Sequence, residues 1–304
     1  MITAFIVYKT TWPWAFWACT IMWAAGWIAL LFVDETLYDR HIPADSNVSR
    51  PTGGTRIQRI LGIQQAKSLN QRSFAQSVMR PIVAVTKVPV FLILVYYFLN
   101  FAWVIGVNTT ISLYLTNFYE FSPKDIGFFY FFGVAGVLLG WFVGHWLHDA
   151  FGRFYASRHG GRIDAEARLM ITYPATALLA LCLVILGLGL GNLWHYMVLA
   201  VVAALQCVGV MIVTTAVNAY LLDCYPEGSG EVSAWVTAAR NWSGFMATYV
   251  QIPWVTRIGA KKAFGIQAGI TAASIFLILF LQLYGKRIRS WQGRMAFGIP
   301  KVKP

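Results

Sequence analysis

Seven long apolar stretches dominate this sequence and leave few ways in which it can fold. Each has about the length of 20 residues that a helix needs to cross a lipid bilayer. Only 12% of the residues are charged, whereas soluble proteins carry about 25%. The sequence therefore predicts an all-α membrane protein and excludes a soluble enzyme, a disordered chain and a secreted disulfide scaffold. The predicted spans are 12–33, 88–116, 126–148, 170–190, 194–222, 232–256 and 263–285.

The distribution of polar residues divides the chain into four parts. Residues 1–33 hold a short apolar start and one full span, and residues 34–87 form a long polar loop. Residues 88–285 contain the other six spans, which we expect to form one bundle. Residues 286–304 form a basic tail.

Lys and Arg are unevenly divided between the two sides of the membrane. Of the 24 such residues, 18 lie in the loops of one side and 5 in those of the other, while Arg240 lies inside a span. Cytoplasmic loops carry the excess of basic residues. This count predicts an external N-terminus and a cytoplasmic C-terminus, with the 34–87 loop in the cytoplasm.

The net charge of +12 does not indicate a nucleic-acid partner, because the basic residues occupy short loops rather than one broad face. The sequence shows no phosphate-binding loop, no Cys/His set with metal spacing and no nucleophile–base arrangement. The four cysteines form no C-x-x-C pair. We therefore expect neither enzyme activity nor a cofactor.

The third span carries glycines at every fourth position, Gly136, Gly140 and Gly144. Small residues at this spacing let two helix backbones approach closely. We favour ordinary packing inside the bundle over dimerisation through this stripe.

The sixth predicted span carries a polar stripe along one side. At 100° per residue its polar side chains, with the exception of Ser243, fall within about a 100° arc. They therefore face either a cavity or a partner helix. Polar groups inside a membrane are costly and are candidates for function. The stripe consists of Ser233, Thr237, Arg240, Asn241, Thr248 and Gln251.

Arg240 has two interpretations that the sequence leaves open. Its charge could line a wet cavity and contact a substrate, or it could pair with Asp223 or Glu231 as a structural gate. Asn100, with Tyr96 on the same face, is a second candidate for substrate contact, and Asn218 is a weaker one.

Several motifs together resemble the major facilitator superfamily, and in particular its fungal twelve-helix drug:proton antiporters. Residues 147–153 read L-x-D-x-x-G-R, which is similar to the family loop signature G-x-L-A-D-R-x-G-R, although Ala150 stands where the family often has Arg. Residues 158–169 are similar to the R-x-G-G-x-x-x-P-E-x-R-L loop, with Ala165 in place of Pro. Further resemblance lies at 14–17, 34–40, 218–231 and 264–267.

The resemblance aligns the chain with family helices six to twelve, preceded by the end of helix five, with 34–87 as the central loop. It implies transport of a small organic molecule by alternating access in the plasma membrane, with proton coupling. Asp149, Gly152 and Arg153, in a tight turn after the third span, would form a gating clasp together with Asp223 and Glu231. Helices one to four have no counterpart, so we expect the chain to be truncated, or to depend on an N-terminal half or on a second copy.

A seven-helix receptor is the alternative from another class. The number of spans and the expected sides of the termini fit such a receptor. The long loop after the first span does not, because receptors of this kind have a short turn there.

Overall fold

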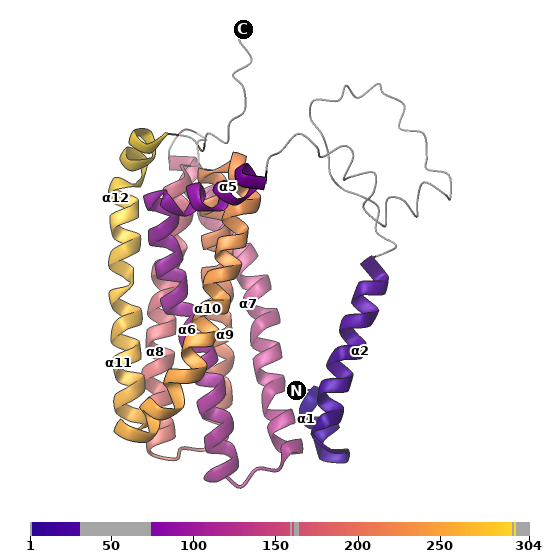
Figure 1. Cartoon of the computed structure of the whole chain (residues 1–304). Coiled ribbons are helices and arrows are strands. Elements are labelled where there is room, and N and C mark those ends of the chain that lie inside the picture. The colour runs from indigo at the N-terminus through magenta and orange to yellow at the C-terminus, as the bar shows by residue number, and fades with distance from the viewer. Residues whose placement is uncertain (1, 31–73, 159, 161–163, 294, 296–304) are drawn as a thin grey trace, which may run out of the picture. The chain divides into compact units, whose positions relative to one another are not determined.

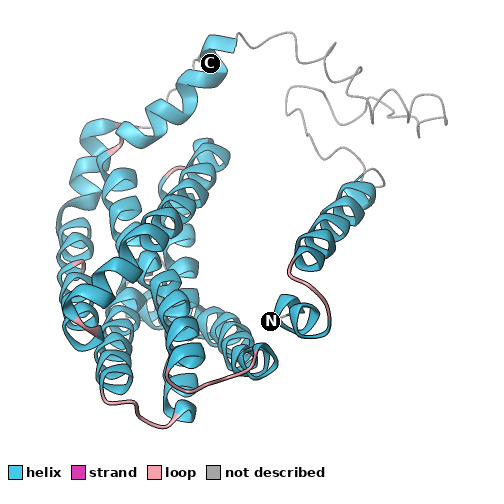
Figure 2. Cartoon of the chain, turned by 60° about the horizontal axis from the view of Figure 1, so that its bottom comes forward, coloured by secondary structure: helices cyan, strands magenta, loops and turns pink. Residues whose placement is uncertain are grey.

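A computed structural model describes residues 2–30, 74–158, 160, 164–293 and 295. Within them the chain consists of helices joined by short loops, and no strand is present in this described part (Figure 2). The prediction of an all-α protein is confirmed. Helices α1 (Ile2–Lys9), α2 (Pro13–Leu30) and α5 (Phe74–Thr86) come first, and α6 (Val88–Asn117), α7 (Pro123–Arg158), η1 (Ala165–Ile171), α8 (Thr172–Gly191), α9 (Tyr196–Cys224), η2 (Pro226–Gly228), α10 (Ser229–Ile258), α11 (Ala260–Ala273) and α12 (Ile275–Gln292) follow.

The chain divides into two compact units. One comprises Ile6–Val78 and includes α2, a helix rich in Trp and Ala. The other contains the residues from Met79 onward and holds the helical bundle. The bundle carries all the residues that concern function below.

Neighbouring helices of the bundle pack lengthwise against each other (Figure 1). Helix α7 lies along α9, α10 lies along α6, and α11 lies along α8. Helix α9 also contacts α8 and α6, which places it at the centre of the packing.

The glycine stripe of α7 is the seam with α9. A Cβ added at Gly136 would lie 2.4 Å from the carbonyl oxygen of Ala204, and one at Gly140 would lie 2.8 Å from the Cα of Val208. No side chain fits at these distances, so the two backbones touch only because both positions are glycine. The predicted role in packing within the bundle is confirmed.

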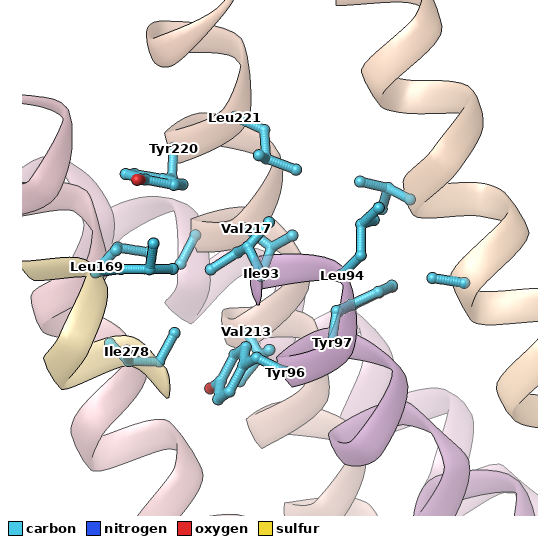
Figure 3. Close-up of a cluster of buried hydrophobic side chains, with 14 of the residues drawn as sticks. Ile93, Leu94, Tyr96, Tyr97, Leu169, Val213, Val217, Tyr220, Leu221 and Ile278 are labelled. Carbon is cyan, nitrogen blue, oxygen red and sulfur yellow. The ribbon is translucent and has the colours of Figure 1, made fainter. Parts of the chain in front are cut away.

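Two clusters of buried side chains fill the bundle. Figure 3 shows the first, in which Tyr96 and Ile93 of α6 lie beside Val213 and Val217 of α9, and to which α12 contributes Ile278. The second cluster draws on α7 and α11 as well as on α6, α8, α9 and α10, and includes Trp103, Leu183 and Phe264. Their burial supplies the packing that fixes the polar groups described below.

Five stretches of the described chain are long and apolar enough to cross a membrane. The two other predicted spans correspond to α2 and α10, which fall outside these five. Helix α10 has 30 residues and is about 45 Å long at 1.5 Å per residue, which is enough to cross a membrane. It differs from the five stretches in carrying more polar residues. The five stretches are Val88–Asn117, Pro123–Arg158, Ala165–Gly191, Tyr196–Cys224 and Ala260–Gln292.

Several element boundaries differ from those expected. The last part of the predicted 34–87 loop is helix α5, while residues 34–73 lie outside the described residues. Helix α7 continues ten residues beyond the predicted end at 148, and α12 continues to Gln292 inside the predicted tail. Both extensions carry charged side chains, which a helix tolerates once it leaves the hydrocarbon region.

Candidate functional site

Helix α10 has one packed face and two open ones. Its packed face lies mainly against α6 and includes Val236, Ala247 and Val255. One open face is apolar, with Trp242 58% and Tyr249 68% exposed. The other is polar, and we call it the open polar face; it consists of Ser233, Thr237, Arg240, Asn241 and Thr248, all of which are exposed.

Arg240 lies on the open polar face above an aromatic ring. Its guanidinium carbon is 5.9 Å from the centroid of the Phe101 ring, which is within the range of a cation–π contact. No acidic side chain of the described chain forms a salt bridge with it.

The two acids considered as partners of Arg240 pair elsewhere. Asp223 binds Arg168, with 2.5 Å between Oδ2 and Nε, and Glu231 binds Arg80 with 2.7 Å between Oε1 and Nε. Glu231 does not pair with Arg240 because the two residues are nine positions apart on the same helix, a distance of about 13 Å. The gate interpretation of Arg240 is therefore not the arrangement in this structure.

Contacts continue from Arg240 across two further helices. The Phe101 ring lies 5.6 Å from the Tyr97 ring on α6, and the Tyr97 hydroxyl lies 3.2 Å from the Thr214 hydroxyl on α9. Asn218, half-buried one turn further along α9, donates a hydrogen bond to the Thr214 carbonyl at 2.8 Å. Helices α6, α9 and α10 thus bring these polar and aromatic groups into one connected set.

Two of the predicted substrate contacts, Asn100 and Tyr96, are buried inside the bundle. Asn100 donates hydrogen bonds to the Tyr96 carbonyl at 2.8 Å and to the Ser274 hydroxyl at 3.0 Å. The Tyr96 hydroxyl lies 2.6 Å from the Thr176 hydroxyl. These bonds tie α6 to α8 and to the α11–α12 junction.

Gln251 is also fully buried, although the helical arc placed it with Arg240. It donates to Thr110 at 3.1 Å and accepts from Gln267 at 2.8 Å, which links α6, α10 and α11. Space for it comes from Gly106, where a Cβ would lie 2.7 Å from the Gln251 side-chain oxygen. The predicted stripe is therefore split between the open polar face and the helix interface.

Salt bridges cluster at the end of the bundle where α9 ends and α10 begins. We call Arg80–Glu231, Arg168–Asp223 and Arg289–Glu166 the ion-pair layer; the last pair has 2.5 Å between Nη2 and Oε1. The side chain of Arg289 is 22% exposed and that of Glu166 is 12% exposed. The layer joins α5, η1, α9, α10 and α12 through charge-assisted hydrogen bonds.

Two side groups extend the ion-pair layer. The second guanidinium edge of Arg168 lies 2.8 Å from the Nε2 atom of His148 on α7. Arg289 also donates to the Cys224 sulfur at 3.1 Å. Beside them, burial raises the pKa of the Tyr225 hydroxyl above its ordinary value.

The predicted gating turn after the third span is not a turn. Asp149, Gly152 and Arg153 lie within the continuous helix α7, and Asp149 is 3.8 Å from His145 one helical turn earlier. Both of these side chains are exposed. The predicted gating residues that enter the ion-pair layer are Asp223 and Glu231.

The sequence analysis assigned no role to Glu166 or to the basic partners of the layer. Arg168 and Glu166 stood in a recognised motif, and that motif was the available signal for them. Arg80 and Arg289 fall in segments predicted as a loop and a tail, where they contributed only to the charge count that predicts the orientation of the chain. Long-range pairing such as Glu166 with Arg289 leaves no local pattern.

Comparisons with known proteins agree on one family. The model of the Major Facilitator Superfamily matches residues 1–248. The chain is 23% identical to the MFS-type transporter penM of Penicillium rubens, over 94% of this chain and 56% of that protein. It is 24% identical to the efflux pump radE of Floropilus chiversii, over 94% and 53%. It is also 24% identical to an uncharacterized MFS-type transporter of Schizosaccharomyces pombe, over 81% and 43%.

The chain spans about half the length of these curated relatives. No solved structure matches it.

Proposed function

The chain belongs to the Major Facilitator Superfamily, and on this premise we propose that it serves as one half of a transporter that moves a small organic molecule by alternating access. The family is one of transporters rather than enzymes. In such proteins the substrate site lies near the membrane midplane, between two half-bundles that rock against each other.

The open polar face of α10 carries this proposal. It exposes five polar side chains, one of them charged, on a helix that lies within a bundle of apolar spans. Polar groups of this kind avoid lipid and face a water-filled cavity or another helix. A second bundle, supplied by an N-terminal half or by a second copy of the chain, would enclose this face and create the cavity.

Within that cavity we assign substrate contact to Arg240, Asn241 and Thr237, with Asn218 at the edge. Arg240 is ten or more residues from either end of α10, and a charge near the bilayer centre costs about 2.5–3.5 kcal/mol or more. Water or a polar substrate would offset this cost. The cation–π contact with Phe101 holds the guanidinium toward the open side.

The ion-pair layer would act as the gate at one membrane surface, with Asp223 and Glu231 as its acids. The charge count along the sequence favours the cytoplasmic side for this layer, and the resemblance to fungal drug antiporters implies the plasma membrane. A proton-coupled cycle would take its principal proton acceptor from the second bundle, because no carboxylate of the described chain lies at mid-span.

The open polar face can be tested by labelling single cysteines with a membrane-impermeant maleimide, in a chain whose four native cysteines are replaced. Thr237→Cys and Thr248→Cys should react through the aqueous cavity. The matched controls Trp242→Cys and Tyr249→Cys, on the apolar face of the same helix turns, should not. Equal reaction at both pairs of positions would contradict a water-facing cavity.

Transport itself is tested by expression in a transporter-deficient yeast, followed by resistance to a panel of toxic small molecules. Resistance only on co-expression with an N-terminal six-helix half would show that this half supplies the second bundle. Resistance with the chain alone would show that a second copy of the chain supplies it. Arg240→Ala should abolish the gain at normal expression, and Arg240→Lys, which keeps the charge without the planar fork, should retain part of it. Undiminished resistance with Arg240→Ala would remove Arg240 from the substrate site.

A further inference from the structure

A separate cavity lies at the end of the bundle opposite the ion-pair layer. Its volume is about 450 Å³, within the range of small-molecule sites. It is formed at the start of α7 and the start of α9, close to the loops that join the helices there. The lining residues are Phe121, Asp125, Phe128, Phe129, Phe132, Tyr196 and Met197.

Aromatic rings make up most of the cavity wall. The Phe121 and Tyr196 rings meet edge to face with centroids 5.2 Å apart, which joins the loop before α7 to the start of α9. Phe129 is only 6% exposed and forms a fixed inner wall, while Phe128 is 52% exposed at the opening. Ring faces carry partial negative charge, so a cage of this kind attracts cations.

Asp125 is the one charged residue that lines the cavity, and no basic side chain is among the lining residues. Its Oδ2 atom accepts hydrogen bonds from the Ser122 hydroxyl at 2.6 Å and from the Ser122 backbone N–H at 3.1 Å. These two bonds fix the carboxylate at the first turn of α7. Lys124, the preceding residue, acts electrostatically on the same carboxylate but does not line the cavity.

We propose that this cavity binds a quaternary ammonium group. Such a group is bulky and apolar on its surface but carries a full positive charge, so it matches aromatic walls together with one carboxylate. Hydrogen-bonding cations fit less well, since the wall offers few acceptors. The group could belong to the choline headgroup of a membrane lipid or to a free organic cation, because helix ends lie at the level of the headgroups.

This site is independent of the proposed transport function, because all of its residues belong to this chain and none lies on the open polar face. It can therefore be tested by binding to the purified chain without any transport measurement. The probe is choline, compared with 3,3-dimethyl-1-butanol, in which a carbon replaces the charged nitrogen. Saturation-transfer NMR in phosphatidylglycerol nanodiscs, which contain no choline, reports the binding of both.

Choline should bind and its neutral analogue should bind about tenfold more weakly, because only choline carries the positive charge that the aromatic rings and the Asp125 carboxylate attract. Asp125→Asn keeps an oxygen for Ser122 but removes the charge, and it should weaken choline binding about fivefold or more. Its matched control is Glu120→Gln, an exposed acid of the same loop that does not line the cavity. Phe128→Leu should also weaken binding, whereas Phe118→Leu, an exposed ring outside the cavity, should not.

The source of the ammonium group is decided by a second arm in phosphatidylcholine nanodiscs. Loss of choline binding there would identify the lipid headgroup as the occupant, and unchanged binding would identify a free organic cation. Equal binding of choline and its neutral analogue would overturn the proposal, as would an unchanged affinity in both Asp125→Asn and Phe128→Leu.

Discussion

Removing Arg289 should destabilise the bundle because it leaves Glu166 charged and largely enclosed. Truncating one partner of a buried ion pair costs about 3–5 kcal/mol. Here the two side chains retain 22% and 12% exposure, so water screens part of that cost and we expect about 2–3 kcal/mol for Arg289→Met. A loss of this size lowers the apparent melting temperature by about 5 °C or more.

The assay heats the detergent-solubilised chain, fused to a fluorescent protein, and measures the fraction that still elutes as a single species. Arg287→Met is the matched control, because this residue is exposed two positions earlier on α12 and should change stability by less than about 0.5 kcal/mol. The double change Arg289→Met with Glu166→Gln removes the stranded charge and should regain most of the loss. Equal effects of Arg289→Met and Arg287→Met, or no recovery in the double variant, would refute this reasoning.

Three further outcomes are expected. Gly136→Val should prevent close packing of α7 on α9 and lower the stability of the bundle by several kcal/mol. Gly133→Val should not, because no neighbouring atom lies within 4 Å of that position. Thermal stability distinguishes the two variants, and equal losses would show that the seam does not depend on glycine. Gln251→Leu should cost about 1–3 kcal/mol, because it leaves two buried hydrogen-bonding partners on α6 and α11 without their bonds, and an unchanged melting temperature would contradict this. Finally, impermeant labelling of intact cells should modify Asn192→Cys but not Ser290→Cys; the reverse pattern would invert the proposed orientation.

The helical fold could be predicted because the patterns that determine it lie within single segments of the sequence. Span length and apolar content located α6 to α9 to within a few residues of their structural bounds, except where α7 continues into polar residues. The glycine spacing in α7 correctly indicated a close contact. Such features depend on the residues of one helix and the properties of lipid.

The site could be predicted only in part, because it depends on what each helix faces. The helical arc grouped Gln251 with Arg240, yet Gly106 on a different helix opens the space that buries Gln251. The angular positions of the residues on α10 do not show which residue of α6 they face. The partners of Asp223 and Glu231 likewise come from other segments, so the sequence could not identify them.

The ion-pair layer also constrains how the chain can mature during synthesis. Glu166 lies 123 positions ahead of Arg289, so the ribosome delivers the acid long before its partner. Until α12 emerges, η1 must keep Glu166 in contact with water at the membrane surface, because an unpaired carboxylate does not enter lipid without cost. The pair with Arg289 can form only after the last helix is complete, and a chain released before Arg289 would leave Glu166 without this partner.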